Sequence, residues 1–282
     1  MSAATESDAR GSDVTGRDAT GPAGEVPLLR VDGFPARHAF TTRAGGVSLA
    51  PWEALNLGLS VGDDPEAVAE NRRRALAAFG ADPDRTAALH QVHGTRPHRA
   101  EKVGPPGTVR GDALISNDPD WTLAVSVADC VPLLLYDPRT GAAAAVHAGW
   151  RGAAAGVVGN AIEALQREFS VDPAELRAAI GPNVSAPAYQ VGPDVVASFR
   201  EAGFPADLAT PDRDAPGRFR LSVAGGVLHA LIRAGVAEDR IVDGGWCTAS
   251  DPDRFYSHRR DRGATGRHWA LVRPGPSMHR AA

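Results

Sequence analysis

Residues 122–147 read TLAVSVADCVPLLLYDPRTGAAAAVH, and this stretch decides the fold class. Three apolar runs, Thr122–Val127, Pro132–Tyr136 and Ala142–His147, are separated only by short breaks. Runs that are apolar throughout, rather than alternating with polar residues, are typical of strands buried on both faces. The stretch therefore predicts interior strands of a layered protein.

The last two of these runs predict a hairpin. The segment from Asp137-Pro138 to Gly141 between them has the composition of a turn. In a hairpin centred on that turn, Cys130 and His147 fall nearly opposite each other. Two chemically active side chains are thus expected at the same end of the sheet.

The rest of the chain alternates between strand-like and helix-like segments. Further strands are predicted at Arg37–Thr42, Ala87–Gln91, Leu176–Ile180, Arg240–Val242 and Trp269–Val272. Helices are predicted from Asp64-Pro65 to Gly80, after Gly152 as far as Phe169, and over Ser222–Ala234. This mixture indicates an α/β or α+β domain over residues 26–274, with a disordered tail at 1–25 and a second tail at 275–282.

Composition narrows the class of protein. The chain has 282 residues, a net charge of −4 and a pI of about 6.1, which favours neither nucleic acid nor an acidic membrane as a partner. Two cysteines make no disulfide framework, and there is no secretory signal and no apolar run of about 18 residues. We therefore expect a cytoplasmic protein, a monomer or weak homodimer, without nucleic-acid or membrane partners.

Three short segments carry the chemistry: His90-Gln-Val-His93-Gly, Ala-Asp129-Cys130, and His147-Ala-Gly-Trp-Arg151-Gly. An isolated Cys among apolar residues is often plain core, and a lone His is often a hydrogen-bonded core residue. The Cys opposed by a His, with His93 as a third donor, favours a metal site instead. Two imidazoles and one thiolate suit zinc with an open fourth position, which is typical of a catalytic site. Copper can bind the same donors.

Other polar residues near these segments are candidates for supporting roles. Asp129 is either a proton acceptor, an orienting residue or a turn residue, and His90 is a second candidate for proton transfer. Arg43 and Arg151 lie beside Gly-rich turns, so they are candidates for binding phosphate, although a surface ion pair explains Arg151 equally well. The segment Phe255–Asp261 combines aromatic and charged residues that can stack on a base and read its edges. Cys247 has no supporting pattern as a further thiol ligand.

The sequence resembles a known family over most of its length. The strings TTRAGGVS, QVHGT, GDALIS, VADCVPLLLYD, AVHAGWRG and FYSHRRDRGATGR occur in the order found in the laccase-domain family, and the resemblance spans Phe34 to Val272. Members have been labelled polyphenol oxidase, peptidoglycan editing factor and purine nucleoside phosphorylase. Gln190 departs from the family, since many relatives carry a carboxylate there.

The resemblance implies a four-layer α-β-β-α sandwich with mixed sheets and a metal site on His93, Cys130 and His147. It also implies phosphorolysis of adenosine, inosine, guanosine and methylthioadenosine to the base and a ribose 1-phosphate, with adenosine deamination. In the leading hypothesis, purine nucleosides and phosphate are the substrates and zinc is the cofactor. Cys130, Asp129 and His90 are the catalytic candidates of this hypothesis, and the resemblance itself does not assign their roles.

Three alternatives stay open. The first is a copper-binding polyphenol oxidase. Multicopper oxidases need many histidines in H-x-H pairs, whereas this chain has nine His and no H-x-H pair. The second is a metal-free hydrolase in peptidoglycan editing, with Cys130 as nucleophile and His147 as base. The third is a non-enzymatic partner of cell-wall or division proteins.

Overall fold

The computed structural model describes residues 25–276. The predicted tails, residues 1–25 and 275–282, lie outside this range except for Glu25, Gly275 and Pro276. Within it, none of the helices has the length and apolar character needed to pass through a bilayer.

Two mixed sheets form the centre of the molecule. The first has the order β1 (Leu28–Leu29), β2 (His38–Thr41), β14 (His268–Val272), β6 (Thr122–Val127) and β3 (Thr86–Ala88). The second has the order β13 (Ile241–Asp243), β9 (Arg177–Ile180), β7 (Val131–Tyr136), β8 (Ala143–Ala148), β5 (Ala113–Ser116) and β4 (Pro97–Arg99). Most neighbours are antiparallel, and the pairs β3–β6, β4–β5 and β9–β13 are parallel.

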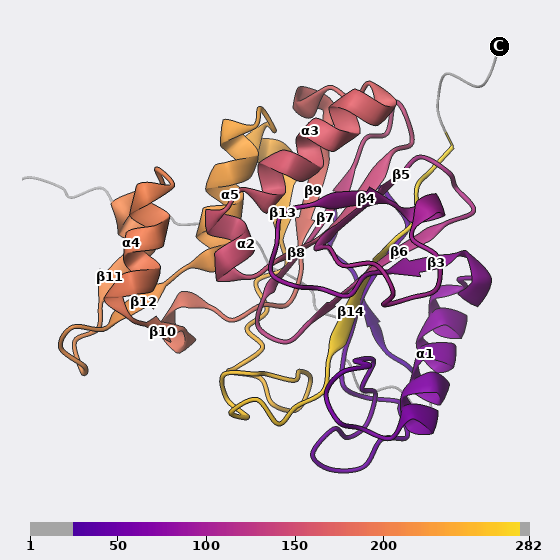
Figure 1. Ribbon diagram of the computed structural model, residues 1–282, viewed down its shortest axis with the longest axis horizontal. Coiled ribbons are helices and arrows are strands. Elements are labelled where there is room, and N and C mark those ends of the chain that lie inside the picture. The colour runs from indigo at the N-terminus through magenta and orange to yellow at the C-terminus, as the bar shows by residue number, and fades with distance from the viewer. Residues whose placement is uncertain (1–24, 277–282) are drawn as a thin grey trace, which may run out of the picture.

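Helices cover the outer face of each sheet, as Figure 1 shows. Helix α1 (Pro65–Phe79) packs on the five-stranded sheet through Leu76 and Phe79. Helices α2 (Trp150–Ala154), α3 (Val157–Phe169) and α5 (Val223–Arg233) lie on the six-stranded sheet. The four-layer α-β-β-α sandwich implied by the family resemblance is thereby confirmed.

The continuous apolar run of β7 now has an explanation. Leu133 and Leu135 point into the core beneath the helices, whereas Leu134 and Tyr136 point into the core between the two sheets. Successive strand residues face opposite sides, so a strand with a core on each side must be apolar at every position. Each fully buried Leu contributes roughly 1.5–3 kcal/mol of hydrophobic stabilisation.

The predicted helices are present, with one difference. Asp64 accepts a hydrogen bond from the Glu66 N–H at the start of α1, and Gly80 ends it with φ 69°. The helix expected after Gly152 is instead two helices, α2 and α3, because the chain turns at Gly156, whose φ is 94°. That left-handed conformation is open to glycine at little cost.

A smaller subdomain was not predicted. Strands β10 (Gln190–Val191), β12 (Phe219–Leu221) and β11 (Ala209–Pro211) form a three-stranded sheet beside α4 (Pro193–Glu201), at one side of the molecule in Figure 1. Short 3₁₀ turns lie at Pro83–Arg85, Ala100–Lys102, Pro173–Glu175, Ala186–Ala188, Ala206–Leu208 and Glu238–Arg240.

Candidate active site

The chain crosses from one central sheet to the other at the point where the predicted ligand residues meet. Cys130 lies between β6 of the first sheet and β7 of the second, and His93 lies between β3 and β4, which also belong to different sheets. His147 lies in β8 and pairs with Pro132 of β7, two residues beyond Cys130. The predicted hairpin is confirmed, and it brings Cys130 and His147 to the same end.

The donor atoms of His93, Cys130 and His147 all lie within 4.8 Å of one another. His93 Nε2 is 3.7 Å from Cys130 Sγ. A tetrahedral zinc ion with ordinary Zn–S and Zn–N bonds separates a sulfur from a nitrogen ligand by about 3.6 Å. Among residues 25–276 this is the one His/Cys/Asp/Glu group with the spacing of a metal site, and its donor set fits zinc.

Asp112 supports this group from behind. Its fully buried carboxylate bonds His147 Nδ1 at 2.8 Å. It also accepts the backbone N–H of His93 at 2.9 Å and of Gly94 at 2.7 Å. Because Nδ1 of His147 is bound to Asp112, Nε2 is the ring nitrogen that remains available to a metal ion. The sequence analysis missed Asp112, although it lies in the GDALIS string that carried part of the resemblance.

Charge coupling shifts the pKa values of these groups. Burial alone would raise the pKa of Cys130, but the charges and hydrogen bonds of His147 and His93 lower it to about 6. Burial alone would lower the pKa of His147, but Cys130 and Asp112 raise it to about 9. The arrangement favours a thiolate, which is the form of cysteine that binds metals and attacks electrophiles.

Two residues of the site have left-handed backbones that are uncommon for non-glycine residues. His93 has φ 58° and Asp129 has φ 83°. Such conformations persist where surrounding contacts impose them, and they concentrate at functional sites. At His93 the contacts are the N–H groups bound to Asp112.

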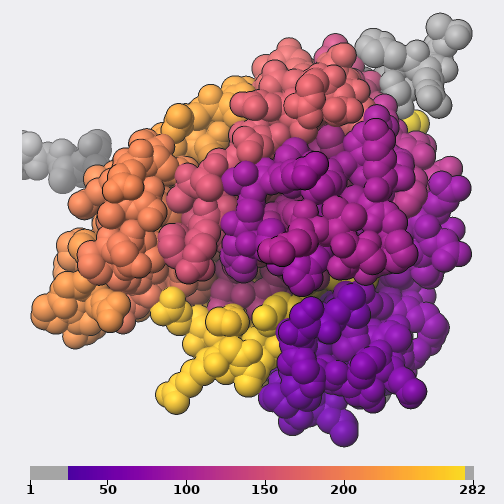
Figure 2. Space-filling view, viewed as in Figure 1, coloured from indigo at the N-terminus to yellow at the C-terminus, as the bar shows by residue number. Residues whose placement is uncertain are grey.

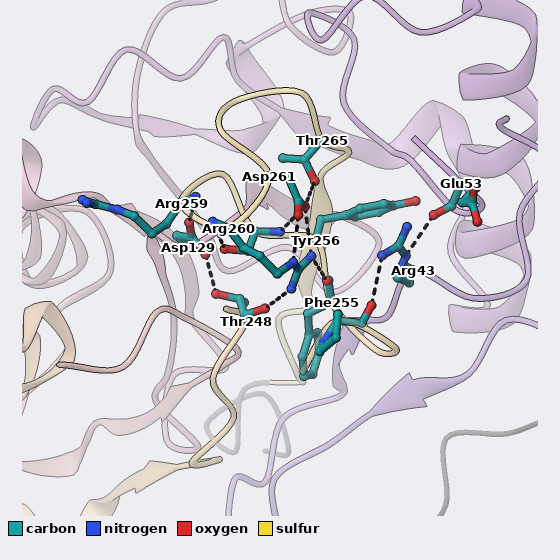
Figure 3. Close-up of polar contacts among 12 residues, drawn as sticks. Arg43, Glu53, Asp129, Thr248, Phe255, Tyr256, Arg259, Arg260, Asp261 and Thr265 are labelled. Carbon is teal, nitrogen blue, oxygen red and sulfur yellow. Dashed lines mark hydrogen bonds and ion pairs between the residues drawn. The ribbon is translucent and has the colours of Figure 1, made fainter. Parts of the chain in front are cut away.

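Asp129 anchors the C-terminal segment to the site (Figure 3). One carboxylate oxygen accepts the Thr248 hydroxyl at 2.6 Å, and the other accepts the Arg259 N–H at 2.5 Å. The Arg260 guanidinium then bonds the carbonyl oxygens of Thr248 and Phe255. Both oxygens of Asp129 are therefore engaged in holding this segment.

A cavity of about 590 Å³ opens over the three ligand residues. This volume is within the range of small-molecule sites. In Figure 2 the surface is recessed between the yellow C-terminal segment and the magenta segment above it. His90, Asp129 and Arg151 line the cavity, and the Arg151 guanidinium stacks on the Trp150 ring at 4.4 Å.

Several sequence-based candidates lie elsewhere. Arg43 does not line the cavity: its guanidinium bonds the carbonyl oxygens of Glu53 and Pro252 and stacks on Tyr256 (Figure 3). Phe255 and Tyr256 are fully buried, so they are not free to stack on a base. The Cys247 thiol accepts from the Ser185 hydroxyl and is not part of the ligand group.

Gln190, the departure from the family pattern, donates to Asp212 at 2.6 Å and is not among the cavity-lining residues. The missing carboxylate therefore does not alter the cavity wall.

Comparison with known proteins shows the family of this chain. Residues 37–274 match the family model described as multi-copper polyphenol oxidoreductase laccase. The chain belongs to this family. The domain bounds at residues 26 and 274 stay predictions.

Similar proteins include named relatives and solved structures. A protein of Deinococcus radiodurans named purine nucleoside phosphorylase is 43% identical over 88% of this chain and 92% of its own length. The crystal structure of YlmD from Geobacillus stearothermophilus superposes with a TM-score of 0.82 at 32% identity, covering 93% of this chain and 98% of that one. The Bacillus licheniformis hypothetical protein YfiH gives a TM-score of 0.82 at 29% identity, over 90% and 98% of the two chains.

Proposed function

We propose that this protein is a zinc-dependent purine nucleoside phosphorylase. The observation that carries the proposal is the group of donor atoms from His93, Cys130 and His147, within 4.8 Å of one another at the floor of a cavity of about 590 Å³. Relatives that share most of this chain's length are named purine nucleoside phosphorylase. The substrates would be adenosine, inosine, guanosine or methylthioadenosine together with phosphate.

The zinc ligands in this proposal are His93, Cys130 and His147. When bound, zinc supplies a Lewis acid with an open position, which can polarise an oxygen ligand or lower the pKa of a bound water. Asp112 holds the His147 tautomer and the backbone of His93. Trp150 and Tyr189 are aromatic members of the cavity wall and would exclude water from a bound nucleoside.

The polar groups that line the cavity are the candidates for proton transfer. His90 is exposed and lines the cavity, so it can exchange a proton with solvent and with a purine nitrogen. Asp129 is unsuited to that role because both of its oxygens already accept hydrogen bonds. We include adenosine deamination in the proposal; in that reaction water adds to C6 of the purine and ammonia leaves, whereas phosphorolysis breaks the bond between ribose C1′ and the base.

The copper oxidase alternative fits the donors less well. The family model carries the words multi-copper and laccase, but the described part of the chain contains one three-donor group. A multi-copper centre needs several such groups. Copper binding to the same three donors remains compatible with their chemistry.

A metal-free cysteine hydrolase is favoured by one observation. Asp112 bonds His147, and the ligand atoms of His147 and Cys130 lie within 4.8 Å of each other, which is the order expected of an orienting acid, a base and a nucleophile. The lowered pKa of Cys130 would suit nucleophilic attack. Metal content separates this function from the first, because a zinc-bound thiolate is not free to attack.

The test is turnover of adenosine, inosine, guanosine and methylthioadenosine with and without inorganic phosphate, on protein of measured metal content. We expect phosphate-dependent release of free base, about one zinc per chain, and loss of both in His93→Ala and His147→Ala. Metal-loaded protein without nucleoside turnover would overturn the proposal. Activity of the zinc-free protein on amide substrates, lost in Cys130→Ser, would favour the hydrolase.

The cytoplasmic location and the monomeric or weakly dimeric state expected from the sequence belong to the same proposal. Sedimentation of the purified chain and fractionation of cells test them.

A further inference from the structure

Two arginines that the sequence analysis passed over lie in the cavity wall. Arg72 lies in α1, and Arg267 immediately precedes β14. Both side chains are half-buried. They approach the cavity from the five-stranded sheet and its helix, whereas His147 reaches it from the six-stranded sheet.

Backbone carbonyls fix the two guanidinium groups. Arg72 donates from Nε and Nη2 to the Leu57 oxygen at 2.9 and 2.7 Å, and it stacks on the Trp269 ring at 4.8 Å. Arg267 donates from Nη1 to the oxygens of Thr265 and Gly266 at 3.1 and 2.9 Å. Because Arg267 and Trp269 are two residues apart, their side chains leave the same face of the chain. The two cations therefore share one wall.

Neither cation has a carboxylate within 4.0 Å in the described residues, unlike the neighbouring Arg73, which bonds Glu70 at 2.7 Å. Burial lowers the pKa of Arg72 to about 10, so it stays charged at neutral pH. Burial also lowers the pKa of Arg267, and the charges of Cys130 and Asp129 oppose that shift. Half-buried charges without a bonded counter-ion are costly, and a bound anion would remove that cost.

We propose that Arg72 and Arg267 form an oxyanion subsite that holds inorganic phosphate. Nη1 of Arg72 and both Nε and Nη2 of Arg267 have no hydrogen-bond acceptor among residues 25–276. Guanidinium groups with free N–H donors match the oxygens of phosphate. The choice of phosphate among oxyanions rests on the proposed function, and the subsite takes the role that the sequence analysis gave to Arg43.

The direct test is calorimetric titration of inorganic phosphate into the full-length, metal-loaded chain. We expect Arg72→Gln and Arg267→Gln each to raise the Kd for phosphate at least about tenfold, since each removes a charge-assisted hydrogen bond. Arg73→Gln is the matched control, because it lies on the same helix but its side chain is 65% exposed and faces solvent. Its phosphate affinity should equal that of the wild type.

Two further measurements keep the test decisive. Arg72→Lys and Arg267→Lys retain the charge and the packing of the stem, so they serve if the Gln variants fold poorly. We expect them to bind phosphate more weakly than the wild type, because a single ammonium replaces the planar fork. Loss of metal rather than of phosphate in Arg267→Gln would identify Arg267 as a counter-charge to Cys130 and would overturn the subsite.

The subsite and the proposed function fail in different ways. Phosphate-dependent turnover with an unchanged KM for phosphate in all four variants would refute the subsite and leave the phosphorylase standing. Phosphate binding that is lost in the variants of a chain with no nucleoside turnover would retain the subsite and refute the phosphorylase. No phosphate binding by the wild-type chain would refute the subsite directly.

Discussion

The carboxylate of Asp112 lies 2.8 Å from Nδ1 of His147, and both side chains are almost completely buried. The same carboxylate accepts the backbone N–H of His93. One residue thus fixes a side chain on β8 and a strained backbone after β3, which belong to different sheets. The position of the donor group therefore depends on a residue that is not itself a donor.

Asp112→Asn is expected to weaken zinc binding about 10–100-fold, the usual effect of removing the partner of a histidine ligand. The amide of Asn must place an NH₂ group against either His147 or the backbone donors of residues 93 and 94. Competition with a chromogenic chelator measures the affinity. Asp120→Asn, at an exposed position, is the control. Equal chelator competition by Asp112→Asn and the wild type would contradict the role of Asp112.

Asp129→Asn is expected to loosen the segment 248–265. Asn tolerates the left-handed backbone of residue 129, so the variant changes the hydrogen bonds and adds little strain. Asn has one acceptor oxygen in place of two and no charge, so its bonds to the Thr248 hydroxyl and the Arg259 N–H lose the charge assistance of bonds to a carboxylate, which contribute about 1.5–3 kcal/mol. Trypsin cleavage after Arg254, Arg259 or Arg262 should accelerate roughly tenfold. Asp253→Asn, exposed in the same segment, should be cleaved like the wild type.

The strands and helices that could be predicted from sequence are those with strong local patterns. The continuous run of β7 and the capped helix α1 lie within one or two residues of their predicted bounds. Strands β10, β11 and β12 were missed because each has only two or three residues and is defined by its partners. No local periodicity exists in such short segments.

The site could be predicted only in part for a similar reason. His93, Cys130 and His147 are recognisable by residue type and by their places beside turns. The role of Asp112 depends on β5 pairing with β8, a contact between distant segments. Arg43 was a phosphate candidate because it lies beside a Gly-rich turn, but the direction of its guanidinium is set by Pro252, which is 209 residues away and could not be foreseen from the local sequence. Arg72 resembles its exposed neighbours in sequence and differs from them only in packing.

The stability of the chain should fall in mild acid because of His268. Its Nε2 accepts the Tyr256 N–H at 2.7 Å, and burial lowers its pKa from 6.5 to about 3. The folded state therefore binds fewer protons than the unfolded state between these values. Stability present above pH 6.5 is lost as the pH falls toward 3, by up to about 1.4 kcal/mol per pH unit from this group.

Urea unfolding of the metal-free chain at pH 7, 6 and 5 measures this effect against His268→Gln. His38, whose pKa burial also lowers, titrates in both proteins and cancels in the difference. The gap between the two proteins should shrink as the pH falls. A gap independent of pH would mean that His268 is not the titrating group. His258→Gln, at an exposed position, should leave the pH dependence unchanged.

Gly149→Ala should weaken zinc binding while leaving the fold intact. A methyl group at residue 149 would lie 2.5 Å from Cδ2 of His93 and 3.1 Å from Sγ of Cys130, too close for either to stay in place. The backbone at Gly149, with φ −72° and ψ 164°, suits alanine, so the substitution adds no conformational strain. His93 is exposed and can rotate away, which breaks the donor group without disturbing the core.

Gly159→Ala is the matched control, because its methyl group would meet nothing within 4 Å and should stabilise α3 by up to about 1 kcal/mol. We expect zinc affinity to fall at least about tenfold in Gly149→Ala alone, with the melting temperature of its metal-free form unchanged. Wild-type zinc affinity in Gly149→Ala would place the metal away from His93 and Cys130.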